Sequence, residues 1–205
     1  MYTQLRKFVT LFCLGMGAAA KHHLPKQWHI GGITSRMGKV TDGNTVSDYG
    51  KEEQKRHFSI SASCIAIEWD GCKINLLDTP GYFDFVGEVE EAVSAADAAI
   101  IVVSGKAGME VGALKAWELC EKYHLPRMVY VSDMDVDQAS YKEVVEDQTQ
   151  LYGKKIAPFH FPIRENEKFV GYVNVVSETG YRWIGKEVEE CEIPDYSRPY
   201  LEKYR

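Results

Sequence analysis

The sequence predicts an α/β fold with a mainly parallel sheet that carries helices on both faces. Apolar runs of strand length alternate with segments of helical periodicity between residues 64 and 152. Strands that alternate with helices form parallel neighbours, and the connecting helices then cover the sheet. Apolar residues make up 45% of the 205-residue chain, which is enough for a sizeable core.

A loop and a hairpin are predicted before residue 78. Residues 1–32 show no clean period of either kind, and residues 33–60 are polar and contain glycine, so they predict a long loop. Residues 64–69 and 72–77 predict two strands. Asp70-Gly71 between them is a strong signal for a two-residue hairpin turn.

Helices and buried strands alternate after Gly81. Val86, Val89 and Val93 recur at helical spacing, and the continuous apolar run over 98–103 is typical of a buried parallel strand. The predicted elements that follow are a helix over 111–119, a strand over 128–131 and a helix over 139–152.

The pattern changes at Ile156. The short segments 159–161, 169–176 and 181–184 predict strands joined by turns, as in a small β-rich insertion or the start of another subdomain. Residues 193–205 predict a closing, charged helical segment, and the sequence ends within it. We therefore expect the sequence to be part of a longer chain.

Composition disfavours several functional classes. The formal net charge of −6 disfavours autonomous nucleic-acid binding, which needs an excess of Lys and Arg. No run of 18 apolar residues predicts a transmembrane helix. The five cysteines (13, 64, 72, 120 and 191) are odd in number and lack a C-x-x-C spacing, so we expect reduced thiols in a cytoplasmic protein. We expect a monomer.

The box Asp78-Thr79-Pro80-Gly81 carries the first functional signal, because it follows a predicted buried strand. Ligands of open α/β sheets bind outside the carboxyl ends of the strands. An Asp at such an end can hold Mg²⁺ directly or through water, and a following Gly lets a backbone N–H approach a γ-phosphate. The alternative is an ordinary strand-to-helix turn, since D-x-P-G is also a good turn sequence.

Longer runs around this box resemble a known family. They are residues 76–89 (Leu-Leu-Asp-Thr-Pro-Gly-Tyr-Phe-Asp-Phe-Val-Gly-Glu-Val), 95–104, 108–112 and 159–176. Together they resemble the translational GTPases of the elongation factor G and tetracycline-resistance (ribosomal protection) group, over about residues 33–205. The resemblance is strongest to paralogues with Tyr after D-T-P-G. It implies a P-loop GTPase-type fold, GTP or GDP with Mg²⁺, and GTP hydrolysis coupled to ribosome function in elongation or ribosomal protection.

The resemblance assigns further site residues. Ser132-Asp133-Met134-Asp135 takes the place of N-K-x-D, in which the final Asp accepts hydrogen bonds from guanine. Only Asp135 matches, and an acidic helix cap is the alternative. Residues 56–60 align with the first switch, R-G-I-T-I, so Ser59 takes the place of the Mg²⁺-ligating Thr; a solvated loop serine is the alternative. Tyr82 replaces the catalytic His, and a phenol lacks the acid–base response of His near pH 7.

The expected phosphate loop is missing. No G-x-x-x-x-G-K-[ST] match occurs, although residues 15–22 (Gly-Met-Gly-Ala-Ala-Ala-Lys-His) lie at the right place. A shifted reading frame joins the third base of each codon to the first two bases of the next codon. In this frame, the codons of Met16 and Gly17 can encode only Gly, and those of Lys21 and His22 can encode only Thr or Ala. The shifted frame permits L-x-G-H-G-G-C-G-K-T-S, so we predict a frame break in this region.

The predicted organisation has three parts. Residues 1–32 are an aberrant, frameshifted phosphate-loop segment, residues 33–155 a GTP-binding domain, and residues 156–205 a truncated part of an insertion subdomain. The family's guanine loop and its ribosome-contacting domains are expected beyond Arg205. Two alternatives stay open: an inactive fragment that lacks the phosphate loop, and a secreted protein whose Arg6-Lys7 and apolar stretch after it form a signal peptide.

Overall fold

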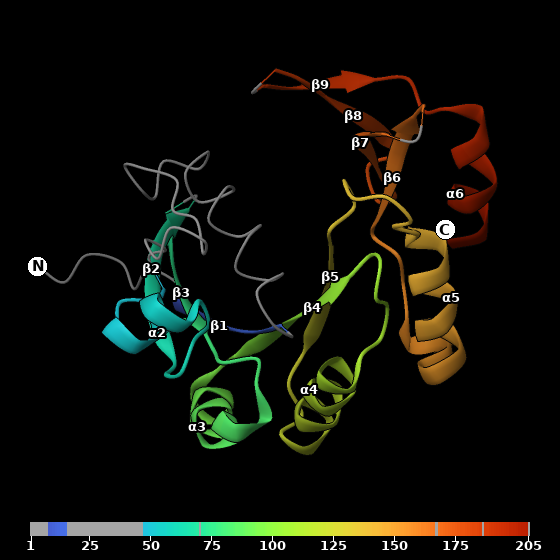
Figure 1. Cartoon of the computed structure of the whole chain (residues 1–205). Helices are drawn as coiled ribbons and strands as arrows, with labels where there is room; N and C mark the ends of the chain where they lie inside the picture. Colours follow the sequence, from blue (N-terminus) through green and yellow to red (C-terminus); the bar gives the residue numbers. More distant parts are fainter. Residues whose placement is uncertain (1–7, 16–46, 70, 167, 186, 205) are drawn as a thin grey trace, which may run out of the picture. The chain divides into compact units, whose positions relative to one another are not determined.

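The computed structural model describes residues 8–15, 47–69, 71–166, 168–185 and 187–204 (Figure 1). The chain divides into two compact units, the first ending at Asp133 and the second beginning at Met134. Within the described ranges, no helix combines the length and the apolar character needed to cross a membrane.

The first unit is built on a five-stranded, mainly parallel sheet with the order β2-β3-β1-β4-β5. Of these five strands, only the edge strand β2 runs antiparallel to its neighbour. The strands are β1 (Phe8–Gly15), β2 (Ser63–Trp69), β3 (Cys72–Asp78), β4 (Ala98–Ser104) and β5 (Arg127–Ser132). The predicted hairpin is confirmed, since β2 and β3 pair directly and Gly71 has a φ of 71° in the turn.

Strand β1 lies within residues 1–32, in which the sequence shows no clean period of either kind. It lies at the centre of the sheet, parallel to both β3 and β4. A strand in the middle of a parallel sheet does not need the alternation of apolar and polar residues that marks a half-exposed strand, so its sequence shows no period of two. The stretch that superficially resembles the core of a signal peptide is this strand.

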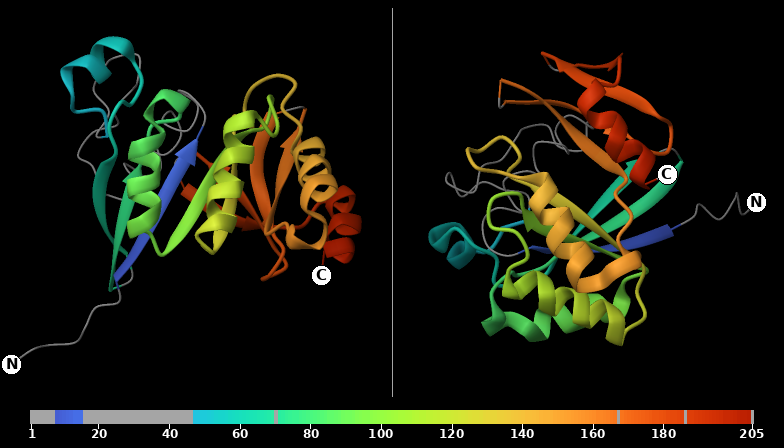
Figure 2. Two further views of the ribbon diagram at one scale, coloured as in Figure 1. Left: turned by 90° about the horizontal axis from the view of Figure 1, so that it is seen from below. Right: turned by 90° about the vertical axis from the view of Figure 1, so that its right-hand side faces the viewer.

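Helices α3 (Val86–Ala95) and α4 (Val111–Lys122) lie on the same face of the sheet, side by side (Figure 2). Their buried residues, among them Val93 and Trp117, lie on the amphipathic face expected from helical spacing. A 3₁₀ turn, η2 (Phe83–Phe85), leads into α3. The predicted α/β class is confirmed.

The predicted loop over residues 33–60 is wrong at its end, because α2 (Lys51–Arg56) is helical. This helix has no apolar face. Its one buried residue is Glu53, so the hydrophobic period that announces most helices is absent.

The second unit joins a helix to a four-stranded antiparallel sheet, β6-β7-β8-β9. Its strands are β6 (His160–Glu165), β7 (Lys168–Asn174), β8 (Thr179–Ile184) and β9 (Glu187–Cys191). The helical elements are α5 (Tyr141–Tyr152), η3 (Gly153–Lys155), η4 (Asp195–Ser197) and α6 (Arg198–Tyr204). The short strands predicted after Ile156 are therefore present.

Helix α5 belongs to this second compact unit, which begins at Met134. The rings of Tyr141 and Phe161 meet edge to face, with centroids 5.8 Å apart. Phe161, Ile163 and Val173 form the buried centre of the unit. Ser140 caps α5, because its hydroxyl accepts a hydrogen bond from the Glu143 amide.

Candidate nucleotide site

The carboxyl ends of the parallel strands in the first unit meet at one edge of the sheet. Asp78, the last residue of β3, is in register with Cys13 near the end of β1. Ser104, at the end of β4, pairs with Ser132 at the end of β5. This edge is where open α/β sheets bind their ligands.

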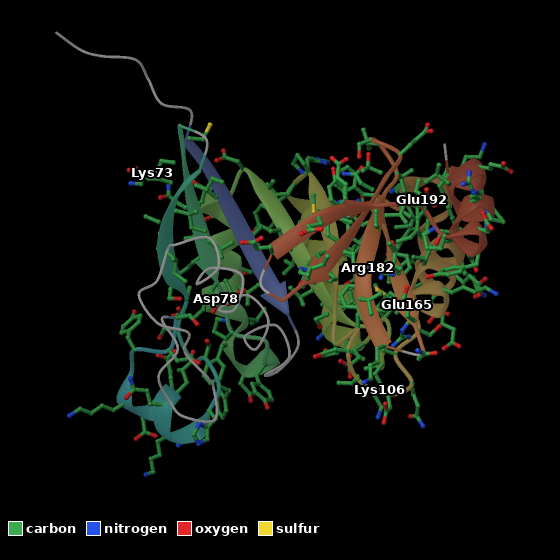
Figure 3. All side chains as sticks on the ribbon, turned by 90° about the horizontal axis from the view of Figure 1, so that it is seen from above. Lys73, Asp78, Lys106, Glu165, Arg182 and Glu192 are labelled. Atoms are coloured by element: carbon green, nitrogen blue, oxygen red, sulfur yellow. The ribbon has the colours of Figure 1, made fainter. Side chains whose placement is uncertain are left out.

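The D-T-P-G box is a buried feature of this edge, where Figure 3 labels Asp78. The Asp78 side chain is 5% exposed, Thr79 is 2% exposed, and Pro80 is fully buried. A turn on the surface would leave these polar side chains in water. Their burial after β3 fits a site better than the ordinary turn that remained the alternative.

Ser59 is buried as well, and its hydroxyl donates a hydrogen bond to Oδ1 of Asp48 over 2.7 Å. Ser59 is 3% exposed and Asp48 is 2% exposed. Ser59 is therefore not the solvated loop serine of the alternative. The segment that contains it leads into β2, whose first residue, Ser63, pairs with Asp78.

Two glutamates that the sequence did not single out hold this segment. Oε2 of Glu53 accepts the Gly50 amide at 2.9 Å, while its Oε1 accepts the amides of Ile60 at 2.9 Å and Ser61 at 3.1 Å. Oε2 of Glu88, on α3, accepts the amide of Ala62 at 2.7 Å. A carboxylate that accepts backbone amides leaves no pattern in a sequence.

Tyr82 joins the two segments through an aromatic contact. Its ring meets that of Phe58 at a centroid distance of 4.9 Å and an interplanar angle of 61°. Phe58 directly precedes Ser59, and Tyr82 directly follows the D-T-P-G box. Half of Tyr82 is exposed, so its side chain remains accessible to solvent.

Ser132 lies buried at the strand edge, and its carbonyl accepts the Gly105 amide at 2.8 Å. Its hydroxyl lies 3.4 Å from the Val103 carbonyl and 3.3 Å from Oδ2 of Asp133. Asp133 adopts a left-handed φ of 55° and closes the first unit. Met134 is buried and Asp135 is exposed at the start of the second unit.

The predicted phosphate-loop segment lies almost wholly outside the described residues. Of residues 15–22, only Gly15 is described, as the last residue of β1. The predicted frame break therefore falls beyond what the structure describes.

Comparisons with known proteins show the family of this chain. Residues 28–191 match the family model "Elongation factor Tu GTP binding domain". The chain is 35% identical over 158 residues to mitochondrial ribosome-releasing factor 2 of Anopheles gambiae, covering 77% of this chain and 21% of that protein. It is 33% identical over 171 residues to elongation factor G of Chlamydia caviae, covering 82% of this chain and 25% of that protein.

A solved structure shows the same fold. The crystal structure of a protein from Thermus thermophilus superposes with a TM-score of 0.88 at 34% identity, covering 96% of this chain and 30% of that one. The chain thus spans about a fifth to a third of the length of the proteins it matches. The chain belongs to the elongation factor Tu GTP-binding domain family, among translational GTPases related to elongation factor G and ribosome-releasing factor 2.

Proposed function

We propose that this chain carries the GTP-binding and GTP-hydrolysing part of a translation factor. The observation that carries the proposal is the convergence of the D-T-P-G box, Ser59 and the end of β5 with the carboxyl ends of the parallel strands. In this assignment Asp78, Thr79, Pro80 and Gly81 face the γ-phosphate. Ser132 to Asp135 recognise the base, with Asp135 as the principal guanine contact.

The residues at hand fit a magnesium ion. The hydrogen of the Ser59 hydroxyl is directed to Asp48, which leaves the oxygen lone pairs for a cation. Asp78 supplies a buried carboxylate, and hard oxygen donors are what Mg²⁺ prefers. When bound, Mg²⁺ neutralises the charge that develops on the phosphate oxygens. Ser59 and Asp78 are therefore the proposed protein ligands, directly or through water.

Tyr82 is the proposed residue beside the attacking water. Its phenol can hydrogen-bond and orient a water, and its contact with Phe58 fixes the ring next to the Ser59 segment.

A second candidate is an inactive nucleotide-binding fold. It is favoured by one observation, the lack of a G-x-x-x-x-G-K-[ST] motif after β1. Backbone amides and the lysine of that motif cradle the phosphates, so a chain without it should hold GTP weakly. A frame break just after the central strand would produce this combination of an intact sheet and a missing cradle.

Fluorescent GTP binding tests both candidates. The chain as given is compared with a frame-repaired chain that reads L-x-G-H-G-G-C-G-K-T-S after the strand. The repaired chain should bind at least about tenfold more tightly, because the cradle amides and lysine are restored. Equal micromolar affinity of the two chains would contradict the inactive alternative, and no binding by either would contradict the proposed function. Sequencing the 5′ end of the gene decides the frame independently.

The wider role is also a proposal. Relatives named elongation factor G and ribosome-releasing factor 2 support the ribosome as a partner of the whole protein. The net charge of −6 agrees with an absence of autonomous nucleic-acid binding. We propose a monomer in the cytoplasm.

A further inference from the structure

Arg164, near the end of β6, reaches the loop that carries Asp135. Its Nη1 donates to the Ala139 carbonyl at 2.5 Å, and its Nη2 donates to the Met134 carbonyl at 3.1 Å. The two carbonyls flank residues 135–138. A single guanidinium therefore holds both ends of the loop, and all three residues belong to the second unit.

The backbone of Arg164 is held as well as its side chain. Strand β6 lies at the edge of its sheet, so one side of the strand has no neighbouring strand to bond. Its pairing with β7 also shifts register between Ile163 and Arg164, where Val170 of β7 is skipped. Tyr196 bonds both backbone groups of Arg164, since its hydroxyl accepts the amide at 3.0 Å and donates to the carbonyl at 3.1 Å.

Among the described residues, this loop makes few hydrogen bonds of its own, so the guanidinium is its main support. Gln138 adopts a left-handed φ of 67°, and the Ala139 amide bonds the Val136 carbonyl only at 3.4 Å. Asp135, Val136, Asp137 and Gln138 are all exposed. The bonds from the guanidinium are charge-assisted and in a fixed fork geometry, so they hold the loop more firmly than neutral bonds would.

We propose that Arg164 is a positioning residue that fixes the 134–139 loop and thereby orients Asp135 toward the guanine edge. The proposal rests on the proposed function for its base-recognition part. The alternative is a role in the stability of the second unit alone. The cavity of about 250 Å³ beside Arg164, lined by α5, β6 and α6 residues, makes that alternative reasonable.

Arg182 offers a matched control. It lies on β8 of the same sheet, is half-buried as Arg164 is, and has a buried Nε without a hydrogen-bond partner, as Arg164 also has. Its guanidinium pairs with Glu165, and Figure 3 labels both residues. Loss of either arginine costs the sheet a cation, but only Arg164 donates to the loop carbonyls.

The first measurement is amide hydrogen exchange in the nucleotide-free chain. In Arg164→Met, the amides of residues 135–139 should exchange about tenfold faster, because two charge-assisted bonds are lost. In Arg182→Met they should exchange as in the unaltered chain. Equal exchange of these amides in both variants would overturn the proposal. If Arg164→Met does not fold, Arg164→Gln is measured in its place.

The second measurement is the preference for GTP over ATP, in whichever form of the chain binds fluorescent GTP. Arg164→Met should lose about tenfold of this preference, while Arg182→Met keeps it. Faster exchange with an unchanged preference would leave a purely structural role and overturn the base-recognition part. If no form binds GTP, the proposed function has failed, and the exchange measurement alone then decides whether Arg164 fixes the loop.

Discussion

The two units stabilise their irregular segments with charges of opposite sign. In the first unit, buried or half-buried carboxylates of Glu53 and Glu88 accept amides of the segment that carries Ser59. In the second unit, the guanidinium of Arg164 donates to carbonyls of the loop that carries Asp135. Each segment lacks regular secondary structure. A side chain therefore provides the hydrogen-bond partners that a helix or a strand ladder would otherwise give to the backbone.

The sign of the charge follows from the backbone groups that need a partner. In the Ser59 segment these groups are N–H donors, so a carboxylate accepts from them. In the Asp135 loop they are carbonyl acceptors, so a guanidinium donates to them. Variants that remove one charge at a time test this contrast.

The largest effect is expected for Glu53→Ala. Three amides lose their acceptor, so the variant should lose about 3 kcal/mol of stability in the first unit, since buried donors without partners are costly. Urea denaturation and exchange of the Gly50, Ile60 and Ser61 amides measure the loss. Glu52→Ala is the control, because Glu52 is exposed and its carboxylate pairs, among the described residues, with Arg56 on the surface of α2; a similar loss there would refute the role of Glu53.

Gly171→Ala tests whether the stability of the second unit depends on close backbone packing in the sheet, and not on hydrogen bonds to charged side chains alone. A Cβ at Gly171 would lie 2.0 Å from the Tyr181 carbonyl oxygen and 3.0 Å from the Arg182 Cα. Backbone on β8 would have to move, at a cost of about 2 kcal/mol or more. Exchange in residues 168–184 measures this cost. At Gly87, on α3, a Cβ meets nothing within 4 Å, so a matching loss in Gly87→Ala would contradict the explanation.

Tyr196→Phe separates the contribution of the Arg164 backbone bonds from that of the Arg164 guanidinium. It removes both bonds to the Arg164 backbone while the guanidinium fork remains, so the second unit should lose about 1 kcal/mol. Thermal denaturation gives the loss. Tyr49→Phe serves as a control, since Tyr49 is 69% exposed. No change in Tyr196→Phe would mean that solvent satisfies the amide and carbonyl of Arg164 equally well.

The smallest effect should be a gain. His57 ends α2 with a left-handed φ of 59°, at the position where the R-G-I-T-I pattern has Gly. Gly adopts this conformation without the steric cost of a Cβ, so His57→Gly should stabilise the first unit by about 0.5 kcal/mol or more. His57→Ala keeps the Cβ and should show no gain. A loss in His57→Gly would indicate that the imidazole contributes more than the backbone strain costs.

Much of the fold was predictable because hydrophobic burial leaves a pattern. The apolar runs over 98–103 and 128–131 correspond to β4 and β5, and the helix predicted over 139–152 corresponds to α5. Polar elements were missed: α2 buries only a glutamate, and the edge strand β9 is almost fully exposed. An element that buries no apolar side chains shows no hydrophobic periodicity from which it could be predicted.

In the candidate site, too, some residues were predictable from the sequence and others were not. Asp78, Ser59 and Ser132 were singled out from motifs, and each is buried at or beside the strand edge. Glu53, Glu88 and Arg164 were not, because their partners are backbone groups that any residue provides. The ring contact between Tyr82 and Phe58 joins segments far apart in sequence and has no local signature.

Strand β1 completes the sheet before the position at which the phosphate-loop pattern fails. The sheet and the expected phosphate cradle are therefore encoded by different residues. A measurement of folding alone does not report whether this chain binds GTP, so each variant of this chain needs a nucleotide-binding measurement beside its denaturation curve.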